Sequence, residues 1–444
     1  MTAREVALAV VRDVFPPADA HATERSAQEA LDYRLRRADV GEQDRGFATE
    51  LAYGAIRMRR TLDWYLEPFI GSRDKPLPAA IQEILRLAFY ELLYMRAQEH
   101  ATTNEWVNLA KKYGHRGVAG LTNAVLRSFL RERPAPPNPD AFADRDDFLG
   151  AKYSFPTWLV RQWRSLFGDA RIDEILEATN RPAQTAIVVN VARTSRDAVA
   201  EALRKRGIES RPSQYAEDAL LVDNASAVRA AEREAGGDWW IQSESSAMVA
   251  DVLNAQPGET IVDACSGRGS KALQAGARLA GDGTLICIEK DARKAEQLSQ
   301  RAAEAGITPA TIVGDATTTE LPDKADRILI DAPCSATGVT GRHPEARWRK
   351  KPDDGARLSG VQWQLLDALL PALHDGGALV YAVCSVDPRE TSEVIERALQ
   401  KHPVMRGLIP SRLAPFQTES GDVVIPPGLE GRDGFYIARL ERRA

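Results

Sequence analysis

Two cysteines stand at the ends of apolar runs, where a thiol can take part in chemistry. In "ILIDAPCSATG", residues 328–338, Asp331 and Cys334 lie three residues apart, directly after an apolar run. In "YAVCS", residues 381–385, Cys384 ends a second apolar run. Free cysteine is among the most frequently buried residue types, so each thiol taken alone is a small core residue. An acid and two thiols at neighbouring strand ends instead indicate a reactive site.

The C-terminal half of the chain alternates strand-like and helix-like segments, a pattern that places these residues together. The strand-like segments are 260–265, 283–290, 310–316, 327–334 and 378–385. Such alternation predicts a mostly parallel, Rossmann-like α/β sheet with helices on both faces. Ligands of this architecture bind at the carboxyl ends of the strands. We therefore expect residues 236–444 to form one α/β domain with its site at that edge.

Other strand ends carry residues suited to a nucleotide-like ligand. The first strand runs into the loop "CSGRGSK", residues 265–271, where Gly267 and Gly269 allow close backbone approach before a helix N-terminus. Its spacing matches neither a P-loop nor GxGxxG. The second strand ends at Glu289, a position that typically binds ribose hydroxyls, and the third at Asp315. The alternatives are a solvated charge at Glu289 and a helix N-cap at Asp315.

The first 235 residues predict two further domains. Apolar residues recur at three- and four-residue steps in segments such as 78–95, and this helical pattern extends over residues 1–135. Four prolines within residues 134–139 end this all-helical domain. Residues 145–235 mix helical and strand-like segments and predict a small α+β linker domain.

Composition excludes several classes of protein. The 444 residues carry a formal net charge of -5, with 44% hydrophobic and 27% charged residues, which argues against coating nucleic acid by bulk charge. The cysteines lie far apart and form no Cys-x-x-Cys pair, so we expect neither a metal nor a disulfide. No apolar run reaches the length of a membrane span. We expect a cytoplasmic monomer without a membrane partner.

The paired cysteine motifs resemble a known family. "DAPCSATG" with "YAVCSVDPRE" is similar to the DAPCS and TCS motifs of the S-adenosylmethionine-dependent RNA 5-methylcytosine methyltransferases. "RHPEARWRK" and "GRDGFYIARL" resemble the bacterial ribosomal RNA branch called RsmB or Sun. "DRGFATELAYGAIRMRRTLDWYL" resembles the NusB-like RNA-binding domain of that branch. The resemblance covers nearly the whole chain.

The chain departs from the family pattern in two places. The first loop usually reads CAAPGGK, whereas here Arg268 replaces the proline and Ser270 the second glycine, with Lys271 kept. Val383 replaces the usual threonine before the second cysteine, and both are β-branched residues suited to a strand.

Downstream, Glu390 is expected to open a helix and fix the loop.

The resemblance implies a 16S ribosomal RNA cytosine-C5 methyltransferase that uses S-adenosylmethionine. Cys384 would add to C6 of the base, Cys334 would assist its release, and Asp331 would lie where cofactor and base meet and bind the N3/N4 edge of the cytosine. Glu289 would bind the cofactor ribose and Asp315 its adenine amine. The loop that lines the cofactor would be Cys265, Ser266, Gly267, Arg268, Gly269, Ser270 and Lys271.

A basic segment follows the fourth strand. "GRHPEARWRKK", residues 341–351, contains a single acid and lies directly after the DAPCS motif. Basic side chains there would clamp RNA phosphates around a stacking tryptophan, and a solvated charge run is the equally weighted alternative. The predicted RNA-binding residues are Arg342, His343, Arg347, Trp348 and Arg349. The target base must leave any stack to reach the thiols.

A second hypothesis is a non-catalytic RNA-binding or antitermination-type factor. The altered loop at residues 265–271 is the feature that supports it. The retained Asp331, Cys334 and Cys384 favour the enzyme, and binding of S-adenosylmethionine discriminates between the two.

Overall fold

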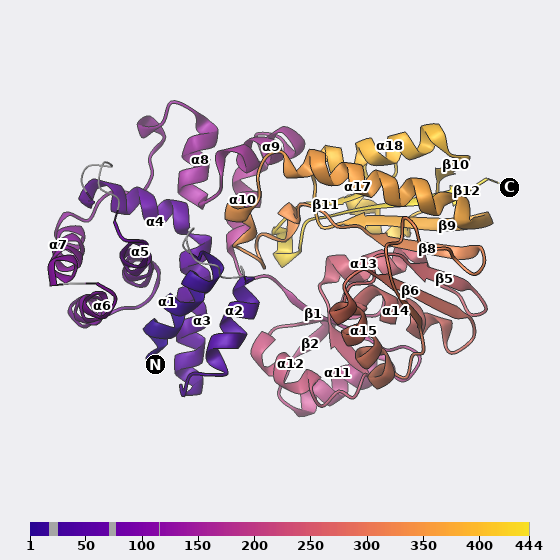
Figure 1. The fold of residues 1–444 in the computed structure, drawn as a ribbon, viewed down its shortest axis with the longest axis horizontal. Coiled ribbons are helices and arrows are strands. Elements are labelled where there is room, and N and C mark those ends of the chain that lie inside the picture. Colours follow the sequence, from indigo (N-terminus) through magenta and orange to yellow (C-terminus); the bar gives the residue numbers. More distant parts are fainter. Residues whose placement is uncertain (17–24, 71–76, 115, 444) are drawn as a thin grey trace. The chain divides into compact units, whose positions relative to one another are not determined.

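The computed structural model describes residues 1–16, 25–70, 77–114 and 116–443, and it divides into two units (Figure 1). The first unit comprises Met1–Asn180 and His343–Arg349. The second comprises Arg181–Arg342 and Lys350–Ala444. The chain therefore leaves the second unit after Arg342, contributes a short segment to the first, and returns at Lys350.

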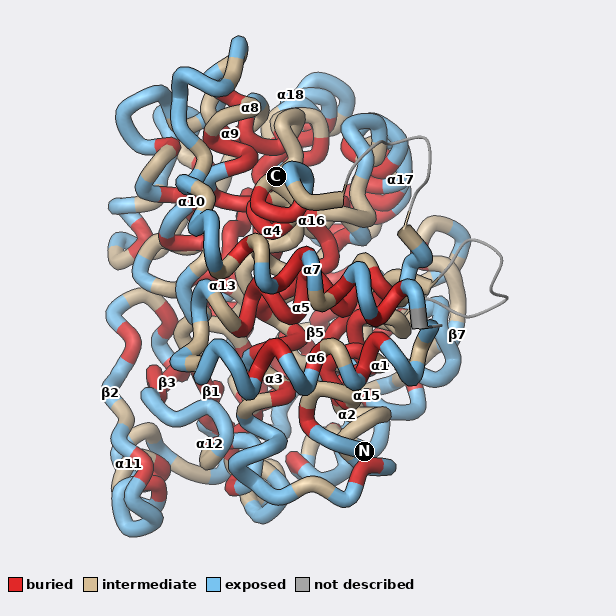
Figure 2. The backbone as a smooth tube through the Cα atoms, turned by 90° about the vertical axis from the view of Figure 1, so that its left-hand side faces the viewer, coloured by how far each residue is buried: buried red, intermediate tan, exposed pale blue. Residues whose placement is uncertain are grey.

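Helices build the described part of the first unit. They are α1 (Ala3–Val14), α2 (Ala27–Leu35), α3 (Glu42–Arg57), α4 (Arg59–Leu66), α5 (Ala79–Tyr94), α6 (Glu99–Tyr113), α7 (Arg116–Glu132), α8 (Arg145–Tyr153), α9 (Thr157–Phe167), α10 (Ile172–Asn180) and α16 (Ala346–Arg349). Helices α1 and α2 begin with capping boxes at Thr2 and Ser26, which satisfy their first N–H groups. Helix α5 is buried along most of its length, as the burial colours of Figure 2 show, and forms the core of the unit.

The second unit begins with a small α+β domain. Its elements are β1 (Thr185–Val189), α11 (Arg196–Lys205), β2 (Ser210–Pro212), β3 (Ala219–Val222), α12 (Ala225–Glu232) and β4 (Trp239–Ile241). The strands form an antiparallel sheet in the order β2-β3-β1-β4. Apolar residues of α11 and α12 pack on one face of this sheet.

A large mixed sheet forms the rest of the second unit. In chain order its elements are α13 (Glu244–Leu253), β5 (Thr260–Asp263), α14 (Ser270–Leu279), β6 (Thr284–Glu289), α15 (Ala292–Ala305), β7 (Ala310–Val313), β8 (Ala325–Asp331), α17 (Asp354–Leu369), β9 (Leu373–Val383), α18 (Ser392–Lys401), β10 (Val404–Arg406), β11 (Val423–Ile425) and β12 (Phe435–Arg442). The strand order is β10-β12-β9-β8-β5-β6-β7, with β11 paired to β12. Strands β5 to β9 are parallel, and β12 joins antiparallel to β9.

Helices cover both faces of this sheet (Figure 1). Helices α13, α14 and α15 pack on one face and α17 and α18 on the other. Residues alternate along β9, where Val380 and Ala382 contact the first layer and Leu379 and Tyr381 the second. Burial on both faces explains the continuous apolar runs of Ile328 to Ile330 in β8 and Ala378 to Val383 in β9. The sequence order reverses between β5 and β8, which is the switch point where ligands bind in such sheets.

The predicted fold class is confirmed: an all-helical region, a small α+β domain and a Rossmann-like α/β domain follow one another along the chain. The exact domain boundaries stay predictions. By their contacts, α8 to α10 group with the helical unit, although their residues fall in the predicted linker domain.

Candidate functional site

The ends of β8 and β9 bring the predicted catalytic residues to one edge of the sheet. The two strands are parallel neighbours, and Asp331 pairs in register with Ala382, two residues before Cys384. Cys334 and Cys384 lie in the loops directly after these strands, and their sulfur atoms are 3.3 Å apart. The strand-end pattern thus correctly predicted that the acid and the two thiols come together.

The contact between the two sulfurs perturbs Cys334. The hydrogen bond to Cys384, together with burial, raises the pKa of Cys334 well above its ordinary value. A thiol with a raised pKa keeps its proton at neutral pH, so Cys334 is itself a weak nucleophile. Burial also raises the pKa values of Cys265 and Cys287, so these two thiols are poor nucleophiles.

A buried carboxylate connects the two cysteine loops. Glu390 is fully buried and accepts hydrogen bonds from the Ser335 N–H at 2.8 Å, the Ser385 hydroxyl at 2.7 Å and Gln362 Nε2 at 3.0 Å. Each serine directly follows one of the two cysteines, so one side chain fixes both loops. The serine after each cysteine was a visible signal for this network. Gln362, from α17, had no such signal in the sequence.

A turn before β12 closes over the first cysteine loop. The Gly338 N–H donates to the Cys384 carbonyl at 3.0 Å, and the Gly434 N–H donates to the Gly338 carbonyl at 2.8 Å. A Cβ on Gly338 would collide with the backbone of Gly434, so this approach requires glycine. Arg342 ends the loop with an ion pair to Asp433 at 3.1 Å.

Three charged groups meet between β5 and β8. Lys271 Nζ lies 2.6 Å from Asp331 Oδ2, which joins the cofactor loop to the predicted catalytic acid. Asp263, at the end of β5, is 1% exposed. Burial, with Asp331 nearby, raises the pKa of Asp263 to about 7. Asp263 was not among the predicted site residues, because a single acid at a strand end does not reveal its burial.

The loop after β5 presents an open backbone beside a carboxylate. Gly267 has a φ of 56°, and no atom lies within 4 Å of the position that a Cβ would take. Its N–H donates to Glu289 Oε2 at 2.8 Å, while Oε1 accepts from the Asp291 N–H at 2.8 Å. Each carboxylate oxygen keeps a lone pair for a further donor. This donor and acceptor set fits a ligand that carries ribose hydroxyls.

Arg301, from α15, supports the same loop from behind. Its guanidinium donates to the Arg268 carbonyl at 2.8 Å and to Ser270 Oγ at 3.1 Å. Both partners are positions at which this loop departs from the CAAPGGK pattern. The serine hydroxyl therefore has a structural partner that a glycine would lack.

Asp315 lies beyond β7 as a fixed carboxylate. Lys290 Nζ lies 2.9 Å from Asp315 Oδ2, and the Thr317 N–H donates to Oδ1 at 3.0 Å. The Lys290 hydrogen bond and those from Thr317 lower the pKa of Asp315 to about 2. The residue is therefore ionised at neutral pH and can accept from an amine.

Three residues of the predicted RNA clamp have partners inside the helical unit. Arg347 is 1% exposed, and Trp348 Nε1 donates to the Ile56 carbonyl at 2.7 Å within the helical unit. Arg349 donates to the carbonyl of Arg25 at 2.6 Å in the same unit. Internal carbonyls thus orient these three side chains. RNA contact by the five predicted residues stays a prediction.

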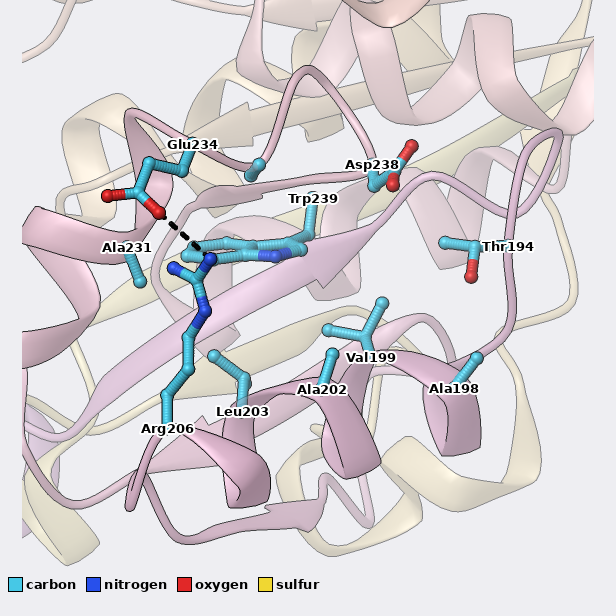
Figure 3. Close-up of a pocket in the computed structure, with 11 residues that line it drawn as sticks. Thr194, Ala198, Val199, Ala202, Leu203, Arg206, Ala231, Glu234, Asp238 and Trp239 are labelled. Atoms are coloured by element: carbon cyan, nitrogen blue, oxygen red, sulfur yellow. Dashed lines mark hydrogen bonds and ion pairs between the residues drawn. The ribbon is translucent and has the colours of Figure 1, made fainter.

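A surface pocket of the small domain lies apart from these residues (Figure 3). It opens between α11 and α12, with the Trp239 ring on one side and the Arg206–Glu234 ion pair at 2.8 Å across its mouth. No thiol lines it, and its lining includes no predicted site residue. The pocket is therefore separate from the candidate reactive site.

Among the residues that the structure describes, no three His, Cys, Asp or Glu side chains gather as metal ligands. Among the same residues, no helix is long and apolar enough to cross a membrane.

Comparison with known families accounts for the three parts of the chain. The model described as 16S rRNA methyltransferase RsmB/F matches residues 250–441. The NusB family matches residues 1–131, and the ferredoxin-like domain of RsmF/B-like methyltransferases matches residues 155–229. These matches, with the parallel sheet and its strand-end site, define the class: a ribosomal RNA methyltransferase preceded by a NusB domain and a ferredoxin-like linker.

Individual relatives agree over the whole length. The probable ribosomal RNA small subunit methyltransferase B of Bacillus subtilis is 32% identical over 419 residues, covering 91% of this chain and 92% of the relative. Ribosomal RNA small subunit methyltransferase B of Thermus thermophilus is 34% identical over 421 residues, covering 94% and 93%. The chain belongs to the RsmB/F family of 16S rRNA methyltransferases, which confirms the resemblance predicted from its motifs.

Solved structures share the fold. The crystal structure of PH0851 superimposes with a TM-score of 0.82 at 22% identity, covering 100% of this chain and 99% of that one. A methyltransferase homologue from Pyrococcus horikoshii gives a TM-score of 0.60 at 23% identity, covering 68% of this chain and 100% of the other.

Proposed function

We propose that this protein transfers a methyl group from S-adenosylmethionine to C5 of a cytosine in 16S rRNA, through a covalent bond between Cys384 and C6 of the base. The observation that carries the proposal is the pair of sulfurs 3.3 Å apart at the ends of β8 and β9. Membership of the RsmB/F family supports the substrate, because that family is described by its action on 16S rRNA.

Cys384 is assigned the role of nucleophile. Cytosine C5 is a weak nucleophile, so a group must first add to C6 and push electrons toward C5. The position of Cys384 directly after β9, with its sulfur 3.3 Å from that of Cys334, supports this assignment. S-adenosylmethionine supplies the electrophilic methyl group on its sulfonium sulfur.

Cys334 and Asp331 act on protons. After methyl transfer the C5 proton must leave before the bond between Cys384 and C6 can break, and Cys334 is assigned to this release step. Asp331 is assigned to the base edge, where its carboxyl group would hydrogen-bond N3 and N4 as charge develops on the ring. Lys271, 2.6 Å away, holds that carboxyl group in place.

The cofactor is assigned to the edge formed by the loop after β5 and the ends of β6 and β7. Gly267 offers an open backbone, and Glu289 has acceptor capacity for ribose hydroxyls. Asp315 is ionised and can accept from the adenine amine.

Trapping of the covalent intermediate tests the proposal. Cys334→Ala should accumulate a protein–RNA adduct that survives denaturing electrophoresis, because the adduct forms but is released slowly. Cys384→Ala should form no adduct and no 5-methylcytosine. Cys287→Ala, at a buried thiol of β6, is the matched control and should behave as wild type in both assays. Reversed outcomes at Cys334 and Cys384 would exchange their roles, and failure of wild type to bind S-adenosylmethionine would favour the non-catalytic RNA-binding alternative.

A further inference from the structure

The segment His343–Arg349 leaves the second unit immediately after the first cysteine loop and becomes part of the helical unit. We refer to residues 343–349 as the plug. Its side chains form hydrogen bonds with backbone groups at the ends of helices. A surface loop does not usually make such contacts.

The two arginines of the plug bind helix C-termini. Arg349 Nη2 donates to the carbonyl of Val14, the last residue of α1. Arg347 Nη1 donates to the carbonyl of Ser154, the C-cap of α8, at 3.2 Å, and its Nη2 donates to the Thr179 carbonyl in the last turn of α10 at 3.3 Å. The last carbonyls of a helix have no partner inside the helix and carry partial negative charge, so cationic donors stabilise them.

The other side chains of the plug complete the set. Glu345 Oε1 accepts from the Ala27 N–H at 3.1 Å, at the N-terminus of α2, where a negative charge is favourable. Trp348 packs against the helical core and donates to the Ile56 carbonyl in the last turn of α3. The plug therefore joins the ends of five helices.

Arg347 shows how firmly the plug is seated. Burial, with Arg57 nearby, lowers the pKa of Arg347 well below its usual value, which marks the cost of enclosing this cation. The Phe155 ring, 3.7 Å from the guanidinium carbon, and Asn180 Oδ1, 2.7 Å from Nη1, offset that cost. A segment held by so many buried contacts cannot shift without disturbing the helical unit.

Both ends of the plug continue into chain that contacts the cysteine site. Upstream lies the loop from Cys334 to Arg342. Downstream, α17 carries Gln362, whose Nε2 donates to the Pro333 carbonyl at 3.0 Å and to Glu390 at 3.0 Å. The plug is therefore continuous on both sides with chain that holds the two sulfurs.

We propose that the plug is a positioning element through which the helical unit sets the geometry of the cysteine loops. This inference rests on the proposed function, because it concerns the step carried out by those cysteines. Helical-unit residues would then affect the rate of the reaction at saturating RNA, besides any effect on RNA affinity.

A flexible insertion at one end of the plug, which leaves its contacts with the helical unit intact, tests this proposal. Insertion of Gly-Ser-Gly between Arg342 and His343 should lower kcat by about tenfold or more. The KM for a 16S rRNA transcript, the Kd for S-adenosylmethionine and the melting temperature should stay close to wild type. The same insertion between Glu419 and Ser420, in an exposed turn, is the matched control and should leave kcat unchanged.

A substitution provides the second measurement. Arg347→Met removes the hydrogen bonds at α8 and α10, and it should lower both the melting temperature and kcat. In the Cys334→Ala background, adduct formation should slow in both the insertion and the Arg347→Met protein. Unchanged kcat in the insertion variant, or a rise in KM alone, would overturn the inference. If wild type is active and the insertion variant has the same kcat, only this inference is refuted. If wild type makes no 5-methylcytosine, the proposed function itself is refuted.

Discussion

The cofactor loop and the cysteine loops lie at the same edge of one sheet, yet different forces hold them. The loop after β5 has open space at Gly267 and is tied by a carboxylate and an arginine at its margin. The cysteine loops are held from inside by Glu390, which is fully buried. In the proposed mechanism, the cofactor enters and leaves in every turnover and needs accessible backbone, whereas the two sulfurs would act in sequence and need a fixed separation.

The difference also appears in how each region treats charge. Glu390 is buried and accepts from four donors, which are the Ser335 N–H, the hydroxyls of Ser335 and Ser385, and Gln362 Nε2. Asp263, at the start of the cofactor loop, is equally buried, but its pKa is raised to about 7. A buried carboxyl group with enough hydrogen-bond donors stabilises its loop. A buried carboxyl group with too few donors has a raised pKa and makes the stability of the protein depend on pH.

The largest effect is expected at Glu390. Glu390→Gln replaces an acceptor-only group by an amide whose NH2 opposes the donors around it, which should reduce the free energy of unfolding by about 2–4 kcal/mol. Misplacement of the sulfurs should lower kcat by about a hundredfold. Chemical denaturation and a methyl-transfer assay measure these quantities. Glu393→Gln, at an exposed position of α18, is the control, and an equal loss there would remove the contrast between the two regions.

An intermediate effect is expected at Asp263. A carboxyl group whose pKa rises from 3.8 to about 7 on folding stabilises the folded state below pH 4, and this contribution is lost as the pH rises through 7. At about 1.4 kcal/mol per pKa unit the loss is a few kcal/mol at most. Asp263→Asn should therefore raise the melting temperature relative to wild type at pH 8 but much less at pH 5.

The control for this prediction is Asp282→Asn, at an exposed position between α14 and β6. The difference between its melting temperature and that of wild type should be the same at both pH values. A wild-type melting temperature that stays constant from pH 5 to pH 8 would show that ionisation of Asp263 does not destabilise the fold. The proposed difference between Asp263 and Glu390 would then be wrong.

The smallest effect is expected at Arg301. Arg301→Met removes the hydrogen bonds to the Arg268 carbonyl and to Ser270, at a net cost of about 1 kcal/mol. The Kd for S-adenosylmethionine, measured by calorimetry, should rise about fivefold. Because the cysteine loops are held separately, adduct formation at saturating cofactor should not change. Arg293→Met, at an exposed position near the start of α15, should leave the Kd at its wild-type value.

Much of the site could be predicted because parallel strands impose a simple rule. Their carboxyl ends share one edge, so Asp331, Cys334 and Cys384 had to come together once the strands were recognised. The fold class followed from the same alternation of apolar periods. The paired motifs also carried the family, which the comparisons confirm.

The contacts that could not be predicted are those between residues far apart in the sequence. The basic segment after the fourth strand looked like a charged surface, because arginines are rarely buried without a carboxylate. Its partners are backbone carbonyls at helix ends, such as Val14 and Ser154, which no local pattern reveals. The pKa of Asp263 likewise depends on burial by the folded sheet and on Asp331, which is distant in the sequence.

The position of the plug has a consequence for synthesis of the chain. The helical unit lacks one of its buried segments until residue 349 has been made, roughly 170 residues after α10 is complete. At translation rates of about 5–20 residues per second this interval lasts roughly 10–35 s. During that time the helix-end carbonyls that bind Arg347 and Arg349 lack these arginine partners. The first unit to leave the ribosome is thus among the last to be completed. Its folding can finish only after β8 and the residues up to 349 have been synthesised.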